Sequence, residues 1–186
     1  MSLKSTVMKA ELQLSDLDRN RYGTFPLTLA QHPSETDLRL MVRVLAFALY
    51  ADERLALGRG LSSEDEPDLW RRDYSGEIEQ WIDLGQPEES RIRKACGRAR
   101  EVVVVSYSGR SAAVWWEKQR GFLQRQKNLT LIDIDGAQAE ALAGLVERSM
   151  RLTVMIQDAV VQVMSDAGSV EVTPRVLVGQ WPDPPA

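Results

Sequence analysis

The stretch that decides the fold runs from residue 80 to residue 105 and reads QWIDLGQPEESRIRKACGRAREVVVV. Its middle opens with Pro87 and two glutamates, which is typical of a helix start, because proline and acidic side chains suit a first turn. It closes with the β-branched run Val102 to Val105, which is typical of a strand covered on both faces. An apolar segment ending at Leu84 comes before the helix. A strand, a helix and a second buried strand in this order predict an α/β fold.

The neighbouring segments extend the same pattern in both directions. Upstream, a helix capped near Ser34 and ending near Tyr50 is apolar on more than one side, which predicts burial in the middle of the domain. Its start carries Ser34 and Asp37 in a capping-box spacing. The other expected elements are strands at 54–61, 69–73 and 77–84, an acidic loop at 62–67, a helix at 111–127, a strand at 129–134 and a helix at 137–149.

Both ends of the chain add strands. Alternating apolar residues at 6–12 and 22–30, separated by a polar turn, predict a hairpin. Residues 151–178 are strand-rich, with a turn expected at 165–169. We therefore predict one domain over residues 1–186, with a mixed central sheet, helices on its faces, extra N- and C-terminal strands and a loose tail at 180–186.

Composition excludes several classes of protein. The net charge is −4, so the chain lacks the overall basic character of most non-specific nucleic-acid binders. A single cysteine and a single histidine exclude both an intramolecular disulfide and a Cys/His metal cluster. The apolar runs are far shorter than the roughly 20 residues needed to span a membrane. We expect a cytoplasmic protein that does not enter membranes.

Two acids mark the candidate site. Asp68 precedes one predicted strand, and Asp83 lies near the end of the next. Adjacent antiparallel strands would bring the two carboxylates together, where at about 4 Å they repel by roughly 4 kcal/mol at an effective dielectric of 20. Such a pair favours Mg²⁺ or Mn²⁺, which prefer oxygen ligands. The alternatives are a solvated loop for Asp68 and a hydrogen bond to the next turn for Asp83.

The spacing is similar to the Pro-Asp…(Asp/Glu)-x-Lys motif of the restriction-endonuclease-like, or PD-(D/E)XK, superfamily. Over nearly its full length the chain also resembles the YaeQ family. The segments that carry this resemblance are His32-Pro33-Ser34-Glu35-Thr36, Tyr50-Ala51-Asp52-Glu53, Asp65-Glu66-Pro67 with Trp70, Trp81-Ile82-Asp83-Leu84-Gly85 and Lys94-Ala95-Cys96. The resemblance implies a nuclease-like fold, with Asp68 and Asp83 as metal ligands and Glu35 as a third acid. Glu35 has an alternative role in complementing the helix dipole.

The chain departs from the superfamily motif at one position. Gly85 stands where the motif has its lysine, the residue that orients the attacking water and offsets charge on the phosphate. In the superfamily this role can move to the following helix, where we expect Lys94 to carry it, with Arg91 as a rival. A compact ammonium suits one water better than a planar guanidinium does. Both side chains have the alternative of a solvated helix face.

Two hypotheses follow. The first is a Mg²⁺-dependent nucleic-acid phosphodiesterase with a degenerate active site, whose residues are Asp68, Asp83, Lys94 and Glu35. The second is a non-catalytic nuclease-fold module that binds a protein partner or nucleic acid. The second is motivated by Gly85 and the acidic net charge. Metal binding and cleavage assays separate the two hypotheses.

Overall fold

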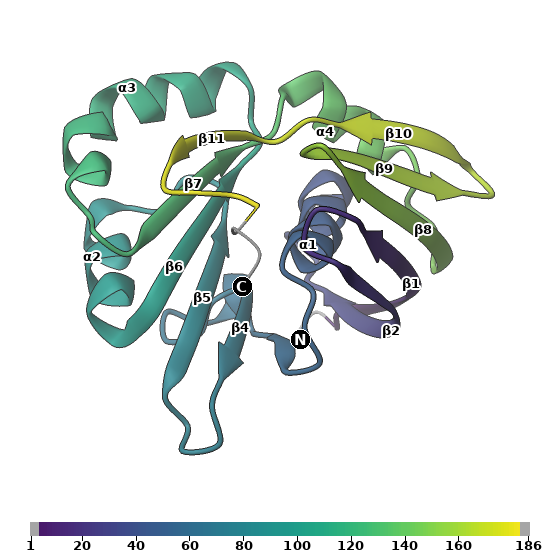
Figure 1. Ribbon diagram of the computed structural model, residues 1–186, viewed down its shortest axis with the longest axis horizontal. Coiled ribbons are helices and arrows are strands. Elements are labelled where there is room, and N and C mark those ends of the chain that lie inside the picture. Colours follow the sequence, from purple (N-terminus) through teal and green to yellow (C-terminus); the bar gives the residue numbers. More distant parts are fainter. Residues whose placement is uncertain (1–3, 183–186) are drawn as a thin grey trace.

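Residues 4–182 form two β-sheets with helix α1 (Asp37–Leu49) packed between them (Figure 1). This architecture comes from a computed structural model, which describes residues 4–182. The prediction of a single central sheet is therefore wrong, because the described residues form two separate sheets. The N-terminal strand pairs in parallel with a strand that begins at Ser149, and this pairing builds a second sheet away from the first. The mixed α/β class is confirmed.

The larger sheet has six strands in the order β11-β7-β6-β5-β4-β3. Neighbours β3, β4 and β5 are antiparallel, whereas β5, β6 and β7 are parallel and are connected through helices. This is the order of strands and helices that the sequence predicts for residues 69–134. The strands of this sheet are β3 (Leu55–Leu57), β4 (Leu69–Arg72), β5 (Ile78–Leu84), β6 (Ala99–Ser106), β7 (Leu129–Asp133) and β11 (Arg175–Val178).

The smaller sheet has five strands in the order β10-β9-β8-β1-β2. The predicted N-terminal hairpin is confirmed, since β1 and β2 pair antiparallel along their whole length. The strand-rich C-terminal region supplies the other three strands. The strands are β1 (Thr6–Asp16), β2 (Arg21–Gln31), β8 (Ser149–Gln157), β9 (Val160–Ser165) and β10 (Gly168–Val172).

The helices divide between the two faces of the larger sheet. Along β5 the side chains alternate, so that Ile82 and Leu84 join the core around α1 while Trp81 joins the core beneath α2 (Glu89–Arg98) and α3 (Arg110–Gln124). Ten of the thirteen residues of α1 are buried, because this helix contacts both sheets and α4 (Gly136–Ala143). The predicted central position of this helix is confirmed.

Several boundaries differ from the predicted ones. Thr36, and not Ser34, caps α1, since its hydroxyl accepts a hydrogen bond from the Arg39 N–H at 3.1 Å. The strand expected to reach residue 61 ends at Leu57, and a 3₁₀ turn follows at Gly60–Ser62. Between β8 and β9 the chain turns at Asp158 and Ala159, both with positive φ, a conformation typical of two-residue hairpins. The Asp18 carboxylate accepts from both of their N–H groups.

The predicted loose tail is packed at its start. Trp181 is 7% exposed, and its indole N–H donates to the Leu49 carbonyl oxygen at 3.3 Å. Residues 183–186 of that tail lie outside the described residues. Within residues 4–182, no helix is both long and apolar enough to cross a membrane.

Candidate functional site

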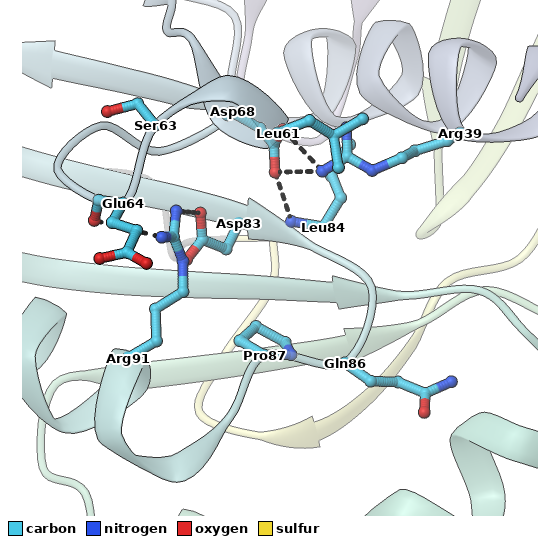
Figure 2. Close-up of a pocket in the computed structure, with 11 residues that line it drawn as sticks. Arg39, Leu61, Ser63, Glu64, Asp68, Asp83, Leu84, Gln86, Pro87 and Arg91 are labelled. Atoms are coloured by element: carbon cyan, nitrogen blue, oxygen red, sulfur yellow. Dashed lines mark hydrogen bonds and ion pairs between the residues drawn. The ribbon is translucent and has the colours of Figure 1, made fainter. Parts of the chain in front are cut away.

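The structure brings Asp68 and Asp83 to one cavity. Leu69 of β4 pairs with Ile82 of β5, so Asp68, which directly precedes β4, lies beside the end of β5 that carries Asp83. Both residues are 3% exposed. Their side chains line a cavity of about 410 Å³ at the carboxyl end of β5 (Figure 2). We call it the acidic cavity; its wall also includes Arg39, Gly60, Leu61, Ser63, Glu64, Leu84, Gln86, Pro87 and Arg91.

Asp68 is held by an arginine from helix α1. The Arg39 Nη2 donates to both carboxylate oxygens, at 2.8 and 2.9 Å, and the Leu84 N–H donates to Oδ2 at 2.9 Å (Figure 2). Gly60 packs directly against the same carboxylate with a φ of +46°, and a Cβ at this position would overlap Oδ1. Asp68 is therefore fixed from three sides by a guanidinium, a backbone amide and a glycine.

Asp83 is held by an arginine from helix α2, on the opposite face of the sheet. Arg91 donates from Nε to Oδ2 at 2.8 Å and from Nη2 to Oδ1 at 3.1 Å, which makes a two-point ion pair (Figure 2). The Trp81 indole N–H adds a third bond at 3.0 Å. Arg91 also donates to the backbone carbonyls of Glu64 and Glu66, and so ties the acidic loop to α2.

Glu35, the predicted third acid, lies behind the acidic cavity and does not line it. Its carboxylate accepts from Arg39 at 2.8 Å and from Arg43 at 2.7 Å, and the residue is 7% exposed. Arg39 thus bridges Glu35 and Asp68. These ion pairs form a chain of alternating charges, two positive and two negative, in the order Arg43, Glu35, Arg39 and Asp68.

Burial and ion pairing act in opposite directions on these groups. Burial, the largest influence, raises the pKa of Asp68 above its ordinary value of 3.8, and the nearby Asp83 adds to the rise while Arg39 opposes it. Burial lowers the pKa of Arg39, but Asp68 and Glu35 together raise it by a larger amount, so its pKa lies above the ordinary value. The hydrogen bonds to Asp83 raise the pKa of Arg91. Both arginines therefore stay charged.

Lys94 lies outside the acidic cavity, and Arg91 lines it instead. The Lys94 Nζ is 3.4 Å from the Asp65 carboxylate, and its side chain is 59% exposed. The position of the motif lysine is itself restricted, because Gly85 has a φ of +94° where the chain leaves β5. Side chains other than glycine are strained in that conformation. Arg91, which the sequence analysis gave as the rival of Lys94, is thus the residue that pairs with Asp83.

The donor set, as arranged, does not fit a resident Mg²⁺ ion. All four oxygens of Asp68 and Asp83 accept hydrogen bonds from guanidinium groups. Their charge is already balanced by Arg39 and Arg91, so a divalent cation here would add uncompensated positive charge. In residues 4–182, moreover, no three His, Cys, Asp or Glu side chains form a group that could hold a metal ion. The metal site remains a prediction.

Arg39 is the residue that sequence reasoning missed. The signal was present, because Arg39 and Arg43 interrupt an otherwise apolar helix at spacings of four and eight residues from Glu35. Side chains four apart share a helix face, so both arginines were placed to meet that acid. The pairing with Asp68 lies 29 residues away and needed the fold to reveal it.

Comparisons with known proteins agree with one another. The family model described as YaeQ protein matches residues 1–174. Among the similar proteins is "Uncharacterized protein YaeQ" of Escherichia coli (strain K12), 43% identical over 173 residues, which covers 92% of this chain and 95% of the relative. The protein of the same name from Salmonella typhi is 46% identical over 168 residues, 90% of this chain and 92% of the relative.

Solved structures support the same relationship. The crystal structure of YaeQ protein from Xanthomonas axonopodis pv. citri has a TM-score of 0.92 and 57% identity, covering 95% of this chain and 99% of that one. The YaeQ structure from Pseudomonas syringae has a TM-score of 0.90 and 37% identity, covering 95% and 97%. Family model, sequence and structure all agree, and the chain belongs to the YaeQ family.

Proposed function

We propose that this chain is a non-catalytic member of the restriction-endonuclease-like superfamily that binds nucleic acid without cleaving it. The observation that carries the proposal is the occupation of Asp68 and Asp83 by the guanidinium groups of Arg39 and Arg91. The superfamily relation is supported by the order of β4, β5, α2 and β6 around these acids, which is similar to the strand–strand–helix–strand core of those nucleases.

The local chemistry argues against hydrolysis. Cleaving a phosphodiester needs an activated water and a group that offsets the charge developing on the phosphate. Here the acids are neutralised, and the position of the motif lysine is a glycine in a conformation that disfavours any side chain. The ammonium of Lys94 lies outside the acidic cavity, beside Asp65. What remains is a scaffold with positive groups around an electrically balanced cavity.

The surface of α2 supports nucleic acid as the ligand. This helix reads ESRIRKACGR, with four basic residues and one acidic residue, although the whole chain has a net charge of −4. Lys94 and Arg98 are exposed. Lys94 lies beside Asp65, whereas Arg98 forms no ion pair within residues 4–182, so its positive charge is presented on the surface of the helix. Such a local basic face can contact phosphates even on an acidic protein, and the resulting affinity falls steeply with added salt.

Binding and cleavage are tested together. Fluorescein-labelled DNA and RNA, single-stranded and duplex, are titrated with protein in the presence and absence of Mg²⁺, and the mixtures are then run on denaturing gels. We expect binding that does not require Mg²⁺, no cleavage, and affinity that is reduced about tenfold or more in Lys94→Glu/Arg98→Glu. A double charge change of the same size far from α2, Arg148→Glu/Arg151→Glu at the start of β8 where both side chains are exposed, serves as control. Metal-dependent cleavage that disappears in Asp83→Asn would refute the proposal.

One observation favours a second candidate, the Mg²⁺-dependent phosphodiesterase. Asp68 directly precedes β4, Asp83 lies on the neighbouring antiparallel strand β5, and both line the same cavity, as paired metal ligands would. Calorimetry with MnCl₂ separates the two candidates, because Asp83→Asn should abolish any binding that uses the pair. Wild-type protein that binds Mn²⁺ and loses it in this variant would favour the phosphodiesterase.

A further inference from the structure

The β4–β5 hairpin extends beyond the rest of the larger sheet and ends in the turn 73–76 (Figure 1). Beside this turn lies a second cavity, of about 490 Å³. It is separate from the acidic cavity. Its charged and aromatic lining residues are Arg54, Trp70, Arg72, Asp73 and Tyr74, and the Asp73 carboxylate pairs with Arg100 at 3.3 Å.

Tyr74 presents its whole side chain to solvent. It is 99% exposed, and the next most exposed tyrosine, Tyr22 on β2, is 61% exposed. The Arg54 guanidinium carbon lies 5.9 Å from the centre of the Tyr74 ring, so a cation approaches this aromatic group without covering it. The ring contributes little to the core and is available to stack against a flat ligand.

Arg72 supplies a positive charge at the same cavity. Its guanidinium lies 4.4 Å from the centre of the Trp70 ring. The structure gives this guanidinium no ion pair within residues 4–182, whereas the neighbouring Arg71 and Arg54 both pair with Glu79, at 2.8 and 3.1 Å. Stacking on tryptophan holds the Arg72 plane in place and leaves its N–H groups free to meet an anion.

Aromatic rings connect this cavity to the basic side of α2. Trp70 pairs with Trp81 across the hairpin, with ring centres 6.3 Å apart in an edge-to-face arrangement. On Trp81 lie the guanidinium groups of Arg98 and Arg91, at 5.3 and 5.7 Å from the ring centre. Arginines and rings therefore follow one another from the acidic cavity to the tip of the hairpin.

We propose that this surface binds single-stranded nucleic acid. It is made of Tyr74, Arg72 and Trp70 together with the exposed basic residues Lys94 and Arg98 of α2. An unpaired base stacks on Tyr74, a phosphate beside that base pairs with Arg72, and the strand continues toward Arg98. A base inside a duplex cannot offer its face to a side chain, so the exposed ring selects single strands. This inference rests on the proposed function, because it names the form of nucleic acid and the surface that binds it.

The test compares two exposed tyrosines. Fluorescence anisotropy with a labelled single strand of about 12 nucleotides, and with the matching duplex, is measured for wild type, Tyr74→Ala, Arg72→Ala and Tyr22→Ala. We expect Tyr74→Ala and Arg72→Ala each to weaken single-strand binding about tenfold. Tyr22→Ala, an exposed tyrosine on the other sheet, should change it less than twofold. All the replaced side chains are exposed or half-exposed, and unchanged circular-dichroism melts verify folding.

The possible failures are distinguishable. If wild type binds single strands and Tyr74→Ala binds them equally well, the hairpin surface is refuted while nucleic-acid binding by the protein stands. Tighter binding of duplex than of single strands would also refute it. If wild type binds neither form at low salt, the proposed function and this inference both fail. Cleavage of the probe that persists in Tyr74→Ala would overturn only the non-catalytic proposal.

Discussion

Replacing Arg39 by methionine tests the neutralised acids most directly. Methionine keeps much of the length and the apolar stem of arginine, so the main loss is the guanidinium group. Among the residues that the structure describes, the change leaves the Leu84 N–H as the donor to Asp68 and Arg43 as the donor to Glu35. Both carboxylates stay buried, at 3% and 7% exposure.

The expected magnitude follows from that burial. Removing one partner of a buried ion pair costs about 3–5 kcal/mol, because the remaining charge loses its compensation. At about 2–4 °C per kcal/mol for a chain of this size, the melting temperature should fall by about 6–20 °C. Asp68→Asn removes the charge that Arg39→Met leaves unpaired. The double variant should therefore be more stable than the sum of the two single changes predicts.

The assay is thermal and urea unfolding, followed by fluorescence, of wild type, both single variants and the double variant at neutral pH. Arg54→Met serves as the control, because its ion pair with Glu79 lies on the surface, and we expect little change. A destabilisation below about 1 kcal/mol for Arg39→Met, or strictly additive effects in the double variant, would refute the view that Arg39 neutralises a buried acid.

Three further predictions concern the same site. Gly60→Ala should lower the melting temperature more than Gly76→Ala does, and thermal melts of the two variants test this. Both glycines have a positive φ, but only at Gly60 would the added Cβ overlap a side chain, that of Asp68. Burial raises the pKa of Asp68 above 3.8, so over a range of pH the native state holds a proton that the unfolded state has released. The contribution of Asp68 therefore makes the unfolding free energy fall as the pH rises from about 4, and this fall stops above the raised pKa. Asp68→Asn should remove that decline in urea titrations between about pH 4 and pH 8, and an unchanged slope would contradict it. Gly85→Lys restores the motif lysine but strains the backbone at a φ of +94°, so we expect it to destabilise the protein by about 1–3 kcal/mol. We also expect that this variant does not cleave labelled DNA. Cleavage would show that the lysine was the only missing part of the active site.

The sequence predicted most of the local structure but not the number of sheets. Alternation and helical periodicity identified the hairpin, the central helix and the buried run Val102 to Val105, because these patterns depend on neighbours in the chain. The partner of the first strand lies near residue 149, and nothing local identifies it. The turn at Asp158 and Ala159 was missed for a related reason. Its positive φ values accompany hydrogen bonds to Asp18, from the other end of the chain.

The candidate site was found in its acids and missed in their partners. Pro67-Asp68 and Asp83 stood out because their spacing fits two adjacent strands, and the register bears this out. Which cations reach those acids depends on the placement of α1 and α2 on opposite faces of the sheet. That placement is tertiary and cannot be read from spacing. Arg91 and Lys94 lie three positions apart on one helix, and only the direction in which the helix packs distinguishes them.

The parallel pairing of β1 with β8 affects how the molecule is made. β1 and β2 leave the ribosome as an isolated hairpin with two open edges, and the strand that covers the β1 edge follows 140 residues later, as the bond between Asp158 and Asp18 illustrates. At about 5–20 residues per second, that edge stays unpaired for about 7 to 28 seconds. During that interval the β1 edge presents unpaired N–H and C=O groups, so the nascent chain offers a template for aggregation. Slower synthesis would prolong this exposure of the β1 edge.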